Sequence, residues 1–313
     1  MSLKYLQMKL AESIARVMPR QMGYGIARRG ADLYLLCDRR GRECVINNLR
    51  RIHQYSGTAL SPRALRALAR ENFLNFAKYL VDFFHFLHLS RERADRLVNF
   101  GIVPQVFDDL LAKGKGLITL SAHLGNWELG AAVLAQRGYP INAVALWQPD
   151  PQLNALYQSY RTNRGIIPIP FGRAARECIA ALRRNEIVAV LGDRDYTGGR
   201  HTVNFFGQPA RLPDGPAKLA LTTGAPILPV FMVRVEGDKF AYVLGEPIWV
   251  DRQHDTVADV MNRIAGELEK VIRAHSEQWY LFHDLWDVEG DRRLAAVAAF
   301  GAKAEDEPRR FSN

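Results

Sequence analysis

From about residue 104 onward the chain alternates between short apolar runs and longer segments with helical periodicity, and this alternation constrains its fold most strongly. Strand-like runs are expected at 116–121, 141–146, 166–169, 187–191, 227–234 and 240–245. Helices are expected at 104–113, 126–137, 151–164, 173–184, 213–223 and 255–275. Strands that alternate with helices form parallel sheets covered on both faces, so we predict an α/β fold with a mostly parallel central sheet flanked by helices.

The first hundred residues have a different pattern, in which we identify helices but no strand-like runs. Helices are expected at 2–18, at 24–54 with a break near Gly41, and at 62–89. We therefore divide the chain into a helical N-terminal portion at 1–100, an α/β core at 101–289 and an ill-ordered tail at 290–313. With 313 residues in all, the first two parts are expected to form one integrated domain.

A histidine and a carboxylate, His123 and Glu128, stand five positions apart where a strand is expected to turn into a helix. Gly125 and Asn126 between them supply turn and N-cap chemistry. His123 therefore falls at the carboxyl end of a strand, where open α/β sheets bind their ligands. A neutral imidazole there can act as a general base, with Glu128 holding its other ring nitrogen. The alternative is a core histidine beside an ordinary first-turn glutamate.

The segment 122–128, Ala-His-Leu-Gly-Asn-Trp-Glu, resembles the His-x4-Asp/Glu signature of the glycerolipid acyltransferase superfamily. Its longer context is similar to the branch that contains the lipid A late acyltransferases and the phosphatidylinositol mannoside acyltransferases. Further blocks stand in the same order as in that branch, at 42–49, at 192–195 with 205–207, and at 212–229. The resemblance spans roughly residues 20 to 286 and implies a glycerol-3-phosphate acyltransferase-like fold.

The resemblance also implies a reaction, the transfer of a fatty acyl group from a thioester to a hydroxyl of a lipid acceptor. The thioester would be carried by acyl carrier protein or coenzyme A, which are substrates, so no cofactor and no metal is expected. His123 would be the general base, paired with Glu128. Arg161, near the position of a functional arginine in the family, or Arg164 would donate to the oxyanion or bind a phosphate. A salt-bridged helix end is the alternative for both arginines.

Other candidate substrate-binding residues fall near the same expected sheet edge. Asp193, Arg194 and Asp195 directly follow the run at 187–191, and one of the aspartates is expected to bind sugar hydroxyls or to hold an arginine. A lone Asp-x-Asp pattern without further carboxylates does not predict a metal site. Asn126 and Trp127 complete the set, and Trp147, close to another strand end, is a further candidate for the substrate channel.

Basic charge is concentrated in residues 1–70, which hold 14 lysines and arginines against four acidic residues, an excess of +10 where the whole chain has +9. An apolar stripe runs along the first expected helix, formed by Leu3, Leu6, Leu10, Ile14 and Val17. Such a helix is suited to an anionic membrane surface, and a basic surface also suits an acidic acyl carrier protein. The alternative is that the stripe packs against the domain. No nucleic-acid recognition motif accompanies the charge, so nucleic acid is not an expected partner.

The expected location is the cytoplasmic face of the inner (plasma) membrane, as a peripheral protein. No run of about 20 apolar residues predicts a membrane-spanning helix, and no secretory leader is evident. Many members of the resembled family begin with a transmembrane helix, and this sequence departs from them there. Three cysteines show no paired spacing that would indicate a disulfide framework or a zinc site, namely Cys37, Cys44 and Cys178.

The acceptor is expected to be a membrane glycolipid. The segment Trp279-Tyr280-Leu281-Phe282-His283 is followed by Asp284-Leu285-Trp286-Asp287, without the arginines typical of lipid A late acyltransferases. Arg194 with 195–197 looks more like the phosphatidylinositol mannoside branch. A lipid A late acyltransferase proper remains an alternative, as does a non-catalytic lipid- or acyl-carrier-binding protein on the same fold. A hydrolase is less favoured, since Ser121 lacks the Gly-x-Ser-x-Gly frame of a nucleophile elbow.

Overall fold

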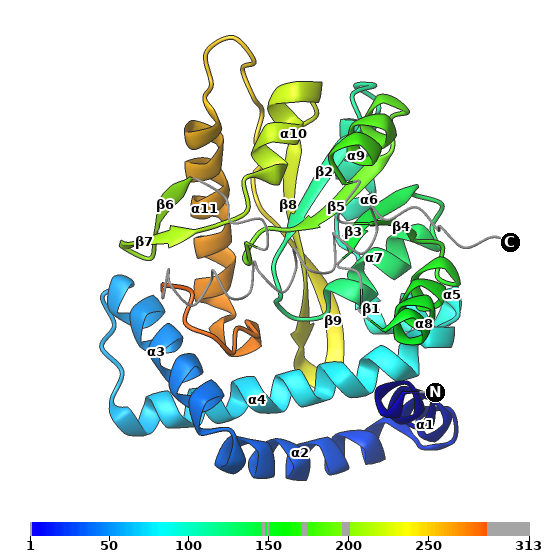
Figure 1. Ribbon diagram of the computed structural model, residues 1–313, viewed down its shortest axis with the longest axis vertical. Helices are drawn as coiled ribbons and strands as arrows, with labels where there is room; N and C mark the ends of the chain where they lie inside the picture. Colours follow the sequence, from blue (N-terminus) through cyan, green and yellow to red (C-terminus); the bar gives the residue numbers. More distant parts are fainter. Residues whose placement is uncertain (1, 146–147, 149, 171–173, 196–200, 287–313) are drawn as a thin grey trace, which may run out of the picture.

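A computed structural model describes residues 2–145, 148, 150–170, 174–195 and 201–286, and confirms the predicted α/β class. A seven-stranded sheet, parallel except for the pairing of β8 with β9, forms its centre (Figure 1). In chain order its strands are β1 (Val98–Asn99), β2 (Leu117–Ser121), β3 (Ile141–Ala145), β4 (Ile167–Pro170), β5 (Ile187–Leu191), β8 (Ile227–Val235) and β9 (Lys239–Leu244). Across the sheet they lie in the order β1-β9-β8-β2-β5-β3-β4.

Strand β5 is inserted between β2 and β3, although it comes after both in the sequence. It pairs with β2 along its whole length, up to Ser121 opposite Leu191. It pairs with β3 only as far as Ala143 opposite Ala189, beyond which β3 continues alongside β4 instead. The carboxyl ends of β5 and β3 therefore separate, which is where a ligand crevice is expected in an open parallel sheet.

Helices cover both faces of the sheet, as predicted (Figure 1). One face packs α6 (Val103–Leu111) and α7 (Trp127–Ala135) against side chains such as Leu117 and Ile187. The other face packs α9 (Ala174–Arg183), α10 (Gly215–Thr223) and α11 (Val257–Ala274) against Ile118 and Val188. Neighbouring residues of one strand thus enter different cores, because successive side chains of a strand point to opposite faces.

The N-terminal helices form a separate layer across one end of the sheet (Figure 1). They are α1 (Leu3–Val17), α2 (Arg20–Cys37), α3 (Arg39–Tyr55) and α4 (Pro62–His85). The break expected near Gly41 lies at Asp38, whose side chain caps α3 by accepting a hydrogen bond of 2.9 Å from the Gly41 amide. Buried Asp82 on α4 attaches this layer to β8, accepting hydrogen bonds of 2.5 Å from Tyr24 of α2 and from Arg234.

The apolar stripe of α1 faces outward and does not pack against the domain. Its side chains are 43% to 84% exposed, and they are Leu3, Leu6, Leu10, Ile14 and Val17. The opposite side of α1 makes the internal contacts, where buried Glu12 accepts a hydrogen bond of 2.9 Å from Tyr160 on α8 (Pro151–Thr162). Among the helices of the described residues, none is long and apolar enough to cross a membrane.

Several short elements were not expected from the sequence. Helix α5 (Arg91–Leu97) and strand β1 are too short to show a clear period, and β6 (Thr202–Phe205) and β7 (Gln208–Arg211) form a separate hairpin. Phe206 and Gly207 at its turn both have positive φ, at 50° and 74°. Two-residue hairpin turns with positive φ usually carry Asn-Gly or Asp-Gly. The Phe-Gly sequence therefore did not predict a hairpin here.

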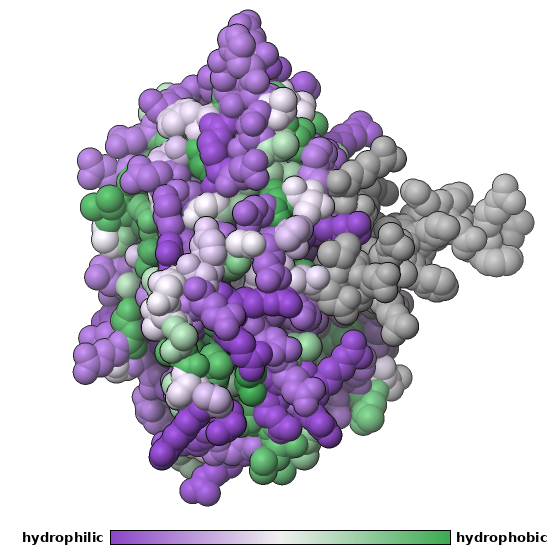
Figure 2. Space-filling view, turned by 90° about the vertical axis from the view of Figure 1, so that its left-hand side faces the viewer, coloured by the Kyte–Doolittle hydropathy of each residue, from purple (hydrophilic) through white to green (hydrophobic). Residues whose placement is uncertain are grey.

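The surface is mostly hydrophilic on the face turned toward the viewer in Figure 2, with separate groups of hydrophobic residues among the polar ones. Several of these groups lie toward the lower end, where the N-terminal helices are drawn in Figure 1. The predicted tail at 290–313 and Trp147 fall outside the described residues.

Candidate active site

His123 lies two residues beyond the end of β2, in a tight turn that neighbouring segments hold in place. Gly125 has a φ of 62°, and a Cβ atom there would lie 2.0 Å from the carbonyl oxygen of Met232. Only glycine fits so close to the backbone of β8. The amide of Asn126 donates to that same carbonyl over 2.7 Å, and the Gly125 amide donates to the carbonyl of Gln278 over 2.9 Å.

The imidazole of His123 is paired with the carboxylate of Asp193. The distance from His123 Nδ1 to Asp193 Oδ1 is 2.8 Å, and the His123 amide donates to Oδ2 of the same carboxylate over 3.0 Å. The strand register explains this pairing. Ser121 lies opposite Leu191 as the last pair of these parallel strands, and His123 and Asp193 each stand two residues beyond that pair. Asp193 is fully buried, while the His123 side chain is 16% exposed.

Electrostatics favour a neutral imidazole beside an ionised carboxylate. Burial alone would raise the pKa of Asp193, but the charge that His123 carries when protonated, its hydrogen bond and the charge of Arg194 hold this pKa well below its usual range. Burial lowers the pKa of His123, an effect that Asp193 opposes and Arg194 reinforces. Because ionised Asp193 accepts the Nδ1 hydrogen, Nε2 is left as the proton acceptor.

Glu128 was expected to pair with His123, and the structure corrects that expectation. Its carboxylate accepts a hydrogen bond of 2.8 Å from Arg161, an ion pair between α7 and α8. Glu128 lies in the first turn of α7, directly after the His123 turn, and Asp193 already occupies the Nδ1 side of the imidazole. Arg161 is thus salt-bridged, and it also lines the cavity described below, so its substrate-binding role stays a prediction.

The other candidate residues are divided between the site and its surroundings. Trp127 stacks on Tyr79, with ring centroids 4.4 Å apart, and its ring lies at 67° to the imidazole of His123, with centroids 5.2 Å apart. Arg164 is buried and donates to the carbonyl of Phe83 over 2.9 Å. Asn126 is also buried, and it caps α7 by accepting the Leu129 amide over 3.0 Å.

Arg194 and Asp195 are close in sequence but differ in setting. The Arg194 side chain lines the cavity and donates to the carbonyl of Tyr280. Asp195 is buried and, with Asn126, Arg164 and Asp193, is not among the residues that line the cavity. Of the candidate substrate-binding residues that the structure describes, Trp127, Arg161 and Arg194 line the cavity and the other four do not.

A cavity of about 860 Å³ is lined by His123 and by residues of both β5 and β3. Consecutive residues of each strand line it, Ala143 with Val144 and Ala189 with Val190. Because consecutive side chains of a strand point to opposite faces, the cavity reaches both sides of the sheet. Its walls on the two sides include Ala131 and Leu134 of α7, and Ala175, Cys178 and Ile179 of α9.

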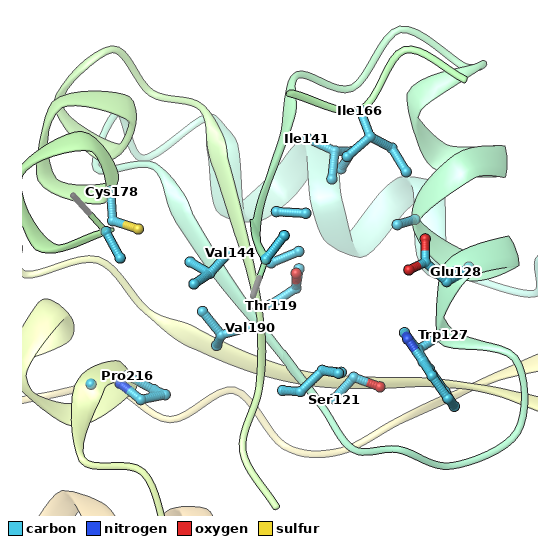
Figure 3. A pocket seen from close by; sticks show the side chains of 18 of the residues that line it. Thr119, Ser121, Trp127, Glu128, Ile141, Val144, Ile166, Cys178, Val190 and Pro216 are labelled. Carbon is cyan, nitrogen blue, oxygen red and sulfur yellow. The ribbon is translucent and has the colours of Figure 1, made fainter. Parts of the chain in front are cut away.

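Most of the charged and aromatic side chains that line the cavity come from α4, α7 and α8. Figure 3 shows Ser121, Trp127 and Glu128 together below the apolar residues Ile141 and Ile166, with Cys178 and Pro216 across the cavity. The cavity thus combines a long apolar lining with a polar end at the His123–Asp193 pair. Among the described residues, no group of three or more His, Cys, Asp or Glu side chains is arranged to hold a metal ion.

Sequence reasoning missed the C-terminal segment 276–281 as part of the site. The Tyr280 amide donates to the carbonyl of His123 over 2.8 Å, and the indole Nε1 of Trp279 donates to Oδ2 of Asp193 over 2.9 Å. Trp279 was noted only within a terminal pattern that bears on the acceptor. Its hydrogen bond depends on how segments far apart in the chain meet, so no local spacing could have indicated it.

Comparisons with known proteins show which family the chain resembles. A family profile described as "Bacterial lipid A biosynthesis acyltransferase" matches residues 5–287. A phosphatidylinositol mannoside acyltransferase of Mycobacterium tuberculosis (strain CDC 1551 / Oshkosh) is 31% identical over 192 residues, and the match covers 59% of this chain but only 60% of that protein. A phosphatidylinositol mannoside acyltransferase of Mycolicibacterium smegmatis is 26% identical over 286 residues, covering 90% of this chain and 91% of that protein.

Proposed function

The chain belongs to the family of bacterial lipid A biosynthesis acyltransferases, and from that premise we propose that it transfers a fatty acyl group from a thioester to a hydroxyl of a membrane glycolipid. The observation that carries the proposal is the His123–Asp193 pair at the polar end of an apolar cavity that passes through the sheet. The site thus combines a general base with room for an acyl chain.

In the proposed reaction, Nε2 of His123 takes the proton of the acceptor hydroxyl as that oxygen attacks the thioester carbonyl. Asp193 keeps the Nδ1 hydrogen in place and stabilises the imidazolium that forms. When the tetrahedral intermediate collapses, the C–S bond breaks and the imidazolium returns its proton to the leaving thiolate. The products are the ester and the free thiol of the carrier, and His123 is neutral again.

The charged residues of the cavity wall are assigned to acceptor binding and to the oxyanion. Arg161 and Glu128 form an ion pair on the wall, which offers both donors and acceptors to sugar hydroxyls. Arg194 stands close enough to the dyad to lower the pKa of His123 and lines the same cavity, which supports assigning oxyanion stabilisation to its guanidinium. The expectation that Arg164 performs this role is not kept, because Arg164 is buried, donates to the carbonyl of Phe83 and is not among the residues that line the cavity.

The acceptor class is proposed from the names of the relatives. Both are called phosphatidylinositol mannoside acyltransferases, which favours a phosphorylated glycolipid acceptor here. Lipid A is the second candidate, favoured by the description of the family profile. The donor is a fatty acyl thioester of coenzyme A or of acyl carrier protein, and neither is preferred.

We further propose that α1 holds the protein on the cytoplasmic face of the inner membrane. Val17, Leu3 and Leu10 are 84%, 71% and 61% exposed, an unusual density of apolar side chains on one helix surface. Helix α2 also exposes large apolar side chains, namely Met22, Ile26, Leu33 and Leu36. The basic excess of residues 1–70 complements anionic lipid headgroups, so apolar insertion and charge act together.

The proposed activity is tested by mass spectrometry of total lipids from cells that lack the protein, cells that carry it and cells that carry His123→Ala. A glycolipid that gains one fatty acyl mass only with the intact protein supports the proposal and identifies the acceptor. His254→Ala is the matched control, because this exposed histidine is bonded to Asp251 and does not line the cavity. Unchanged glycolipids would favour a non-catalytic binding protein, and released free fatty acid would favour a hydrolase.

A further inference from the structure

The C-terminal segment 276–281 lies against the His123 turn. Trp279 forms a β-bridge with Leu124, and the amide of Tyr280 donates to the carbonyl of His123 over 2.8 Å. The carbonyl of Gln278 accepts the amide of Gly125 over 2.9 Å. Three consecutive residues of this segment thus contact the turn that carries the general base.

Trp279 reaches beyond the turn to the carboxylate of the dyad. Its Nε1 donates to Oδ2 of Asp193 over 2.9 Å, and its side chain is buried. Oδ2 also accepts the His123 amide over 3.0 Å, while Oδ1 faces His123 Nδ1 at 2.8 Å. Three donors therefore fix the plane of a carboxylate that has no access to water.

We propose that Trp279 is a positioning residue, whose indole N–H holds the Asp193 carboxylate in the orientation that the His123 base requires. The inference rests on the proposed function, since it concerns the efficiency of the same reaction. Trp279 acts through Asp193 and does not line the cavity, so it is not a catalytic residue.

The indole can perform this role because the backbone that carries it is fixed from the opposite side. Asn72 of α4 donates to the carbonyl of Trp279 over 2.7 Å, and Asn72 is fully buried. The Gln278 side chain exchanges two hydrogen bonds with the backbone of Arg234, at 2.8 and 2.9 Å. The indole also packs against Phe205, with ring centroids 6.4 Å apart. These contacts leave Trp279 little freedom to move away from Asp193.

Losing the indole N–H has a defined electrostatic consequence. Oδ2 would keep only the His123 amide as a donor. The negative charge of the carboxylate would then be stabilised by fewer hydrogen bonds, and the carboxylate would rotate more freely. A less stabilised carboxylate attracts the imidazolium more strongly, which raises the pKa of His123. Because the base must be neutral, the acid limb of the pH profile moves to higher pH, and misorientation of the carboxylate lowers kcat.

The test compares Trp279→Phe with Trp286→Phe in acyl transfer assays. Both indoles pack near Phe205 and each donates one hydrogen bond, but Trp286 donates to the backbone carbonyl of Phe205 over 3.1 Å, so it is the matched control. We expect Trp279→Phe to lower kcat by roughly tenfold with little change in KM, and to shift the acid limb upward. Trp286→Phe should keep the wild-type kcat and pH profile. Equal behaviour of the two variants would overturn the proposal.

A nuclear magnetic resonance titration of the wild-type protein tests the same contact without relying on activity or on a variant that folds. The Trp279 indole N–H signal should shift with pH at the midpoint at which His123 titrates, because both groups share the Asp193 carboxylate. The Trp286 indole signal serves as the internal control and should not follow that midpoint. An indole signal of Trp279 that ignores the titration of His123 would overturn the inference, whereas wild-type protein without transferase activity would count against the proposed function alone.

Discussion

At the scale of single residues, two carboxylates compete for the role of partner to His123. Asp193 is bonded to the imidazole, whereas Glu128 is bonded to Arg161. Sequence spacing favoured Glu128 because it stands one helical turn from the histidine. Spacing along a chain measures neither the direction of a side chain nor the competition for it by an arginine on another helix.

The two carboxylates can be separated by substitution. Asp193→Asn should lower kcat by roughly 10³-fold to 10⁴-fold, because an amide in that place can favour the wrong tautomer of His123. Glu128→Gln removes the charge that pairs with Arg161 and should mainly raise KM for the acceptor, by about tenfold. Steady-state kinetics with both substrates provide the measurement, with circular dichroism to establish that each variant is folded. A larger loss of kcat in Glu128→Gln than in Asp193→Asn would restore Glu128 as the dyad partner.

The pH dependence of the reaction follows from the burial of His123. Its pKa is lowered from 6.5, and the base is active when neutral, so activity is present above this pKa and lost as pH falls through it. We expect the acid limb of kcat/KM to have its midpoint below pH 6.5. A rate profile with saturating donor and limiting acceptor measures this midpoint. A midpoint clearly above 6.5 would mean that another group, or a positively charged His123 in the resting enzyme, governs the limb.

At the scale of secondary-structure elements, α1 combines two surfaces with different roles. Glu12 and Met8 face inward, toward Tyr160 and Tyr157 of α8, and Tyr157 also lines the cavity. The apolar stripe faces outward. The periodicity of the sequence identified the stripe correctly but could not tell whether it packs inside or faces the surroundings. The choice is decided by Glu12, whose burial places the opposite side of the helix against the domain.

Charge placed on the stripe should therefore weaken membrane binding without disturbing the fold. Leu10→Glu and Val17→Glu each remove an apolar side chain worth about 1.5 kcal/mol when buried, so binding to anionic vesicles should fall by about tenfold. Ile102→Glu at the start of α6 is the control, because Ile102 is 65% exposed but lies outside the stripe. Sedimentation with vesicles measures the partition. Equal effects of the three substitutions would contradict a specific role for α1.

At the scale of the whole molecule, strand order decides the site. The alternating pattern predicted the sheet, its helical cover and the strand ends that carry His123 and Asp193. It could not predict that β5 lies between β2 and β3, because that order depends on how the crossing helices pack and not on any local run. The same insertion pairs Ser121 with Leu191, bringing His123 and Asp193 together, and separates the ends of β5 and β3 to open the cavity. One topological feature therefore produces both the dyad and the passage beside it.

The passage through the sheet leads to a prediction about the length of the acyl chain. Val190 lines the cavity on β5, next to the last residue that pairs with β3, so a larger side chain there should narrow the crossing. We expect Val190→Phe to shift the preferred donor to shorter acyl chains, while kcat with the shortest accepted donor changes less than about threefold, since the dyad is untouched. A series of thioester donors of increasing length, each assayed with wild-type and variant protein, measures this preference. If the acyl chain stays on one side of the sheet, the length profile of Val190→Phe will match that of the wild type, and the crossing between β5 and β3 will not be part of the acyl site.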